Sequence, residues 1–435
     1  MPGNCEGWLD ENSLARFVVE IMEQLDTRAI EQAYGGGGSP PYPPKMMLAL
    51  LFYCYAKGIF SSRKIERATY ELIPVLFITG GTHPDHDSIN TFRKRFLGEL
   101  SDLFVKLLQI AHGMGVLKLG DISMDGTKIK ANASKHKAMS WEYACKLEQQ
   151  LRSEVEELIK RAESESGQGK QEIDIPVELQ RRETRLQKIA EVKAELERRA
   201  AERYAQEQAD YAAKLKEREE KEQERGRKLG GKPPKAPEPG PQAKDQANFT
   251  DGDSRIMPTA SGFEQAYNAQ ASVDMATMLI IGRHVSQNPN DKQEVVPALG
   301  VLSRLPDDLG GIARAAADSG YFSKDNIQQF EAAGIEPYLP NGRQHHNPTL
   351  EERFVKVPEA PKNADSVAAM AHRMKTEAGK KFYAQRKSTV EPVFGIIKEV
   401  MGFRRFMLRG LNAVQGEWVL VCMAFNLKRL CVLSF

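Results

Sequence analysis

Residues 122–134 read ISMDGTKIKANAS, with Asp125 near the centre. Apolar residues alternate with a small polar residue before the acid, and Gly126 follows it. This alternation predicts a buried strand that delivers the Asp125 carboxylate to an exposed edge. A lone Asp-Gly pair more often only shapes a turn. Asp125 is therefore a candidate metal ligand only if other acids join it.

Two later stretches each place an acid at the end of a predicted element. Residues 312–317 form a short apolar run that ends at Asp318, and a helical pattern follows. Glu391 opens a helix-like segment, because Pro392 suits a first helical position. Three carboxylates supply the oxygen ligands that Mg²⁺ prefers. Two such ions can activate one oxygen and stabilise the leaving one in phosphodiester displacement.

The order of the three acids, together with basic and aromatic residues around the last of them, resembles the DDE transposases of bacterial insertion sequences. The supporting residues are Tyr383, Arg386 and Lys398. The stretch YPPKMMLALLFYCYAKGIFSSRKIERA resembles the amino-terminal domain of these enzymes. GFEQAYNAQASVD, followed by VSQNPND, resembles the middle of their catalytic domain. Four residues separate Arg386 from Glu391 here, a gap that varies among relatives.

The resemblance implies an RNase H-like catalytic core of the α/β class. It also implies that Asp125, Asp318 and Glu391 are the catalytic residues and the ligands of Mg²⁺, with Mn²⁺ as a substitute and two ions per site. Tyr383, Arg386 and Lys398 would then contact the phosphates that flank the cut. Lys398 follows Glu391 by close to two helical turns, so both side chains should face one way.

The same resemblance implies an activity and a partner. A transposase binds the terminal inverted repeats of its element, cleaves DNA at the ends and joins the 3′ ends to target DNA, and two element ends imply a homodimer. One alternative is an inactive DNA-binding or scaffolding derivative of a transposase. Another is a phosphatase with a nucleophilic Asp, in which two Asp residues lie two positions apart. This chain departs from that pattern, because the residue two positions before Asp125 is Ser123 and not Asp.

The size and charge of the chain allow a DNA-binding enzyme. Its 435 residues suggest two or three domains, and the net charge is +2. Residues 380–435 carry 10 Lys and Arg against 3 acids, which suits either a phosphate backbone or a solvated helix face. Neither a membrane-length apolar run nor a signal pattern is present, so we expect a cytoplasmic, nucleoid-associated bacterial protein. The five scattered cysteines predict reduced thiols.

Hydrophobic periodicity divides the chain. We predict a helical amino-terminal DNA-binding domain, a catalytic domain in two pieces, a helical insertion with opposite charges interspersed, and a Pro/Gly/Lys-rich linker. The amino-terminal domain spans 1–115, and the catalytic domain spans 116–140 and 248–435. The helical insertion spans 141–229, and the linker spans 230–247. The insertion should form two helices that fold back as a hairpin or pair with another subunit.

Basic residues near two of the predicted elements are candidates for binding DNA. Arg63 and Lys64 open a predicted helix, and a later helix is expected to expose Arg93 to solvent. Short helices with such a basic outer face either bind DNA or form a helical packing domain without that role. Lys128 and Lys130 follow Asp125 and either hold the substrate strand or face solvent.

Residues beyond the linker predict the rest of the catalytic fold. Residues 263–273 and 278–285 read as strands, and 291–305 as a helix that crosses over to the strand before Asp318. Strands followed by a crossover helix place the domain in the α/β class.

Overall fold

The computed structural model describes residues 5–34, 41–164, 175–227, 230, 232–259, 261–342 and 364–435. They form two compact units, residues 1–132 with 256–435, and residues 133–255. The amino-terminal helices thus cluster with the sheet, and the domain boundary at residue 115 stays a prediction. Of residues 228–231, around the expected start of the linker, only 230 is among the described residues.

The first unit begins with helices. They are α1 (Leu14–Gln24), α2 (Arg28–Gln32), α3 (Pro44–Ala56), α4 (Ser62–Glu71), α5 (Ile73–Thr79), α6 (His86–Arg95) and α7 (Leu100–Gly113), after a short 3₁₀ turn at Cys5–Trp8. Ten of the residues of α3 are buried, as its apolar sequence requires. Lys94 and Arg95 of α6 are exposed, but the prediction that Arg93 faces outward is wrong. Its guanidinium is buried because it donates to the Tyr55 hydroxyl at 2.9 Å and to the Phe60 carbonyl at 3.0 Å.

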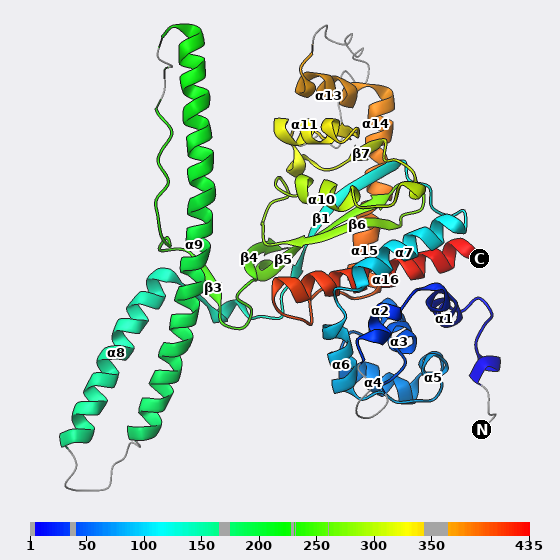
Figure 1. Cartoon of the computed structure of the whole chain (residues 1–435), viewed down its shortest axis with the longest axis horizontal. Coiled ribbons are helices and arrows are strands. Elements are labelled where there is room, and N and C mark those ends of the chain that lie inside the picture. The colour runs from blue at the N-terminus through cyan, green and yellow to red at the C-terminus, as the bar shows by residue number, and fades with distance from the viewer. Residues whose placement is uncertain are drawn as a thin grey trace. The chain divides into compact units, whose positions relative to one another are not determined.

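A mixed sheet forms the centre of the first unit (Figure 1). Its strands are β1 (Asp121–Lys130), β4 (Arg255–Thr259), β5 (Gly262–Asp274), β6 (Ile280–Ser286), β7 (Arg314–Ala316) and β8 (Glu336–Tyr338). The order is β4-β5-β1-β7-β8, with β6 also paired to β5. β1 runs antiparallel to β5 and parallel to β7, and β7 runs parallel to β8. The α/β prediction is confirmed.

Helices flank this sheet. They are α10 (Val295–Leu302), α11 (Lys324–Ala332), α13 (Ser366–Lys375), α14 (Glu377–Ala384), α15 (Val390–Gly395) and α16 (Leu411–Ser434). α16 contacts β6, α7 and α3, so it joins the sheet to the amino-terminal helices. Buried Asn426 fixes it there, accepting from the Ile280 N–H at 2.9 Å and donating to the Ile280 carbonyl at 2.7 Å. Among the described residues, no helix has the length and apolarity needed to span a bilayer.

The second unit is a helical hairpin on a two-stranded ribbon. β2 (Ala138–Ser140) pairs with β3 (Gln246–Asn248), and between them lie α8 (Trp141–Ser164) and α9 (Ile175–Arg225). Apolar residues of both helices share one buried cluster, including Leu147, Leu151, Ile189, Val192 and Leu196. Ion pairs from Glu148 to Lys193 (2.6 Å) and from Glu154 to Arg182 (2.8 Å) fix an antiparallel arrangement. Of the two predicted arrangements, the structure shows the hairpin.

Two predicted elements differ in extent. β1 does not end at Asp125 but continues to Lys130, because β5 pairs with it along that whole length. The helix expected over 291–305 spans only Val295–Leu302, and the residues before it form a turn in which the Glu294 N–H donates to the Asp291 carbonyl at 3.0 Å. Asp291 therefore lies in a loop.

Candidate active site

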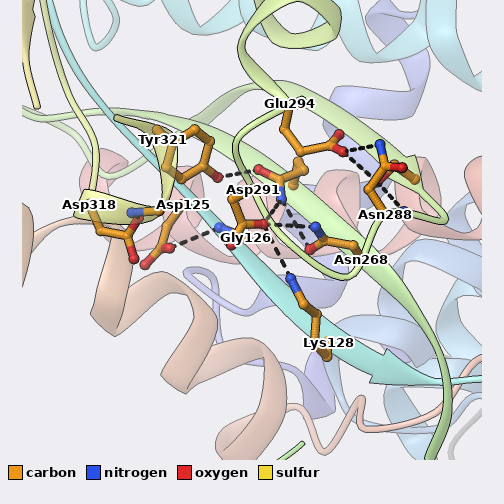
Figure 2. Close-up of polar contacts among 12 residues, drawn as sticks. Asp125, Gly126, Lys128, Asn268, Asn288, Asp291, Glu294, Asp318 and Tyr321 are labelled. Carbon is orange, nitrogen blue, oxygen red and sulfur yellow. Dashed lines mark hydrogen bonds and ion pairs between the residues drawn. The ribbon is translucent and has the colours of Figure 1, made fainter. Parts of the chain in front are cut away.

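The register of two parallel strands brings the first two predicted acids together. Ser123 of β1 pairs with Ala316 of β7, where β7 ends. Asp125 and Asp318 each stand two residues beyond that pair, so they leave the paired region side by side. Figure 2 shows their carboxylates pointing toward each other. Asp125 itself is opposite Ala271 of β5, which fixes its backbone on the other side.

Asp125 is held in an environment that disfavours its charge. The pKa of Asp125 is raised to about 6, mainly by burial and also by the nearby carboxylates of Asp318 and Asp291, although the Arg386 guanidinium and the Gly126 N–H lower it. The Gly126 N–H donates to Asp125 Oδ1 at 2.9 Å. Like charges beside a buried carboxylate are the arrangement that a bound cation relieves.

Arg386 links Asp125 to Glu391. It lies in the 3₁₀ turn Gln385–Ser388, immediately before α15, and its Nη1 is 3.2 Å from Glu391 Oε1 and 3.5 Å from Asp125 Oδ2. The Arg386 side chain is 11% exposed and that of Glu391 is 48% exposed. Glu391 stands in the first turn of α15, as predicted. The guanidinium therefore bridges the partly buried Asp125 and the more accessible Glu391.

Tyr383 and Lys398 complete this cluster. Burial raises the pKa of the Tyr383 hydroxyl, the Arg386 guanidinium lowers it, and the three predicted acids raise it further. Lys398 lies on a π-helical turn, Ile396–Val400, a distortion often found at functional sites. Its Nζ donates to the Lys128 carbonyl on β1 at 3.4 Å, and burial lowers its pKa.

The other predicted DNA-binding residues fall into two groups. Lys128 Nζ pairs with Asp291 Oδ1 and Lys130 Nζ with Glu264 Oε1, both at 3.2 Å, so each lysine of β1 has a carboxylate partner. Arg63 and Lys64 are exposed on α4 and belong to the amino-terminal helices, not to the elements that carry the acids. Their role in binding DNA stays a prediction.

Sequence reasoning missed Asp291 and its two amide partners on β5. Asp291 Oδ1 accepts from Asn268 Nδ2 and from Gln270 Nε2, each at 2.7 Å. A signal was present, since Asn268 and Gln270 occupy alternate positions of a strand that is otherwise apolar and buried. Buried amides on one face of a strand require partners. Asp291 gave no such signal, because it stands at the start of the helix predicted over 291–305.

The chemistry of the donor set fits a hard divalent cation. Within the described parts of the chain, no three or more His, Cys, Asp or Glu side chains are grouped as a metal site. Mg²⁺ is usually held by one or two protein carboxylates, with waters and substrate phosphates as its other ligands. The facing pair Asp125 and Asp318 meets that requirement.

Comparison with known proteins adds two family matches. A model described as Transposase DDE domain matches residues 351–431, which contain Tyr383, Arg386, Glu391 and Lys398. A model described as Transposase domain (DUF772) matches residues 4–95, the first six helices. Neither a curated protein nor a solved structure matches the chain. Asp125 and Asp318 lie outside both matched ranges, so their assignment depends on the geometry above.

These two matches indicate the fold of the catalytic core and the general type of activity. The DDE domain implies an RNase H-like core, in agreement with the mixed sheet, and it suggests an enzyme of the nuclease or transferase type that acts on DNA. The family generally uses divalent metal ions, and the two domains together indicate a function in transposition. Matches at both ends of the chain support its identification as a DDE transposase of the insertion-sequence type.

Proposed function

We propose that this protein binds the terminal inverted repeats of an insertion sequence, cleaves DNA at the element ends and joins the 3′ ends to target DNA. Asp125, Asp318 and Glu391 are the acids of its active site. The observation that carries the proposal is the β1–β7 register, which sets Asp125 against Asp318 while Arg386 ties Asp125 to Glu391 within the segment matched by the DDE domain.

Asp125 and Asp318, with Glu391, would hold the divalent cations. Mg²⁺ is the natural choice for oxygen ligands, Mn²⁺ is a substitute, and two ions per site suit phosphodiester displacement. When bound, the ions lower the pKa of water and stabilise the charge on the leaving oxygen. The raised pKa of Asp125 favours this assignment, because a cation compensates the unfavourable charge of that buried carboxylate.

The remaining residues of the cluster would orient the DNA. Arg386 can present two N–H donors to one phosphate, whereas Lys398 acts as a point charge. Tyr383 supplies a hydroxyl whose pKa responds to Arg386 and to the three acids. Partly buried Lys398 is held against β1, because its Nζ donates to the Lys128 carbonyl. Because Arg386 is buried and Tyr383 and Lys398 are partly buried, a phosphate that replaces water there interacts more strongly with them than it would in bulk solvent.

DNA recognition would involve the helices of the amino-terminal segment. Arg63 and Lys64 on α4 and the two exposed basic residues of α6, Lys94 and Arg95, are suited to phosphate contacts. Lys128 and Lys130 could guide the substrate strand beside the acids. A homodimer would hold the two ends of one element, each copy contributing one active site.

Replacing Asp125 with Ala tests the proposal. The variant should bind duplexes carrying the native terminal repeat as tightly as the wild type does, yet cleave none of them in Mg²⁺. Mapping the cut to the nucleotide should place it at the element border in the wild type. Cleavage retained by Asp125→Ala would refute the site. Wild-type protein that binds the repeat but never cuts it, in Mg²⁺ or Mn²⁺, would instead identify an inactive DNA-binding derivative.

A further inference from the structure

Asp291, in the loop between β6 and α10, collects three hydrogen bonds on one oxygen. Asp291 Oδ1 accepts from Lys128 Nζ at 3.2 Å and from Asn268 Nδ2 and Gln270 Nε2 at 2.7 Å each. The Asp291 side chain is 18% exposed. Figure 2 shows it among these polar side chains, beside Asp125. A carboxylate that organises three donors fixes their positions relative to one another.

These bonds connect Asp291 to the segments that carry Asp125 and Asp318. Lys128 lies three positions after Asp125 on β1, so one bond joins the loop to the strand of the first acid. Gln270 leads to the second acid, because its Oε1 accepts a short hydrogen bond from the Tyr321 hydroxyl. Tyr321 ends the 3₁₀ turn that begins after Asp318, and its N–H donates to the Asp318 carbonyl at 3.2 Å.

The loop that carries Asp291 is itself fixed at two points. Asn326 Nδ2 donates to the Lys292 carbonyl at 2.8 Å and to the Tyr321 carbonyl at 2.7 Å, which holds the loop beside the turn after Asp318. Fully buried Glu294 accepts from three side chains of the preceding segment, His284, Ser286 and Asn288. Asp291 therefore stands on a fixed base.

Packing around Gly126 shows how closely this network approaches Asp125. A Cβ at position 126 would lie 2.0 Å from Gln270 Nε2 and 2.6 Å from Asp291 Oδ1. Gln270 Nε2 donates a hydrogen bond to Asp291 Oδ1, and each of these atoms has further hydrogen-bond partners. Neither atom can therefore move away from an added Cβ without disturbing the others. Only glycine leaves room for the network directly beside the acid.

We propose that Asp291 is a positioning residue, which holds the carboxylates of Asp125 and Asp318 at the spacing needed for a shared divalent cation. This inference rests on the proposed function, because it concerns the same cation site. Asp291 acts through Gln270 and Lys128 and adds a negative charge near the cation. Partners of metal ligands contribute 10- to 100-fold to metal affinity in general, and a loss of about that size is expected here.

Asp291→Asn is the appropriate variant. Asparagine keeps the size of the side chain, and its oxygen can accept the same three hydrogen bonds at the place of Oδ1, but it loses the charge and puts a donor in place of the acceptor Oδ2. Glu264→Gln is the matched control. Glu264 accepts a hydrogen bond at 3.2 Å from Lys130, which lies on β1 as Lys128 does. The Glu264→Gln variant therefore removes an equivalent ion pair with a lysine that has no link to Gln270.

The experiment measures Mn²⁺ binding to the full chain by electron paramagnetic resonance, alongside cleavage of a duplex carrying the native element border. Asp291→Asn should need about 10- to 100-fold more Mn²⁺ for half-saturation. Its thermal unfolding and its affinity for the duplex should match the wild type, and high Mn²⁺ should restore part of the cleavage. Glu264→Gln should bind Mn²⁺ like the wild type.

Each failure has a distinct signature. Unchanged Mn²⁺ affinity in Asp291→Asn, with wild-type protein that binds and cuts, would overturn the positioning role alone; so would an equal loss in Glu264→Gln. Wild-type protein that neither binds Mn²⁺ nor cuts would overturn the proposed function itself. If Asp291→Asn does not fold, Tyr321→Phe decides, because it removes only the hydroxyl between Gln270 and the turn after Asp318. A severalfold loss of Mn²⁺ affinity in Tyr321→Phe supports the positioning role of Asp291. An unchanged Mn²⁺ affinity refutes it.

Discussion

Replacing Asp125 with Asn should stabilise the metal-free protein at neutral pH. The pKa of Asp125 is about 6 in the folded chain and 3.8 in its ordinary state, so the folded state binds the proton more tightly. A pKa difference of about two, at about 1.4 kcal/mol for each tenfold change in proton affinity, corresponds to on the order of 3 kcal/mol. The side chain is 17% exposed, so solvent screens little of this effect.

The pH range of the effect follows from the direction of that pKa difference. Stability contributed by protonated Asp125 is fully present below about pH 4 and is lost as the pH rises to about 6. The Asn variant carries no charge at any pH and can still accept from the Gly126 N–H. Its advantage over the wild type should therefore grow across this interval and stay constant above it.

Urea unfolding in EDTA at pH 7.5 and at pH 4 measures the difference. We expect Asp125→Asn to be more stable by on the order of 3 kcal/mol at pH 7.5 and about equal to the wild type at pH 4. Added Mg²⁺ should stabilise the wild type and leave the variant unchanged, because binding only to the folded state raises stability.

Asp121→Asn is the control for a carboxylate on the same strand. Asp121 accepts from Arg314 Nε at 2.8 Å and makes a second, shorter bond to the same guanidinium, so neutralising it should give no gain at pH 7.5. An Asp125→Asn variant that is no more stable than the wild type at pH 7.5 would refute the reasoning. Equal gains in both variants would show that general charge reduction is the cause.

Three further outcomes follow from other contacts. Asn426→Ala should lower the free energy of unfolding by about 2–4 kcal/mol in urea melts, because two buried groups of Ile280 lose their partner; a loss below 1 kcal/mol would contradict this. Glu417→Ala should cost about 2–4 kcal/mol, since the Tyr55 hydroxyl and the N–H groups of Met407 and Leu408 lose their acceptor; unchanged melts would count against it. Gly126→Ala should abolish cleavage and leave the far-ultraviolet circular dichroism unchanged, and full cleavage would show that its neighbours can move.

The sequence could predict the site where local chemistry defines it. The apolar run before Asp318 ends a strand, and Glu391 and Pro392 lie in the first turn of α15, which begins at Val390 and not at the predicted Pro392. The local sequence predicts that the strand ends at Asp125, because the alternation of apolar and small polar residues stops at Gly126. It continues because β5, more than a hundred residues later, pairs along its whole length. Pairing at such distances leaves no trace in local periodicity.

Two residues illustrate what a single sequence does not contain. Arg93 has the sequence context of an exposed basic helix, yet the Tyr55 hydroxyl and the Phe60 carbonyl offer it buried acceptors. Asp291 lies in a loop, and its partners are two amides on β5 and Lys128 on β1. In both cases the decisive partner comes from another element, so composition and spacing around the residue are uninformative.

The ribbon formed by β2 and β3 bears on how this chain folds during synthesis. Lys130 and Glu264, which meet across β1 and β5, are 134 positions apart in the sequence. The intervening α8–α9 hairpin is complete by Arg225, before β5 leaves the ribosome, and the ribbon then brings Ala138 next to Asn248. Shortening the remaining loop in this way saves on the order of 1–2 kcal/mol of closure entropy. The folded insertion therefore lowers the entropic cost of pairing β1 with β5.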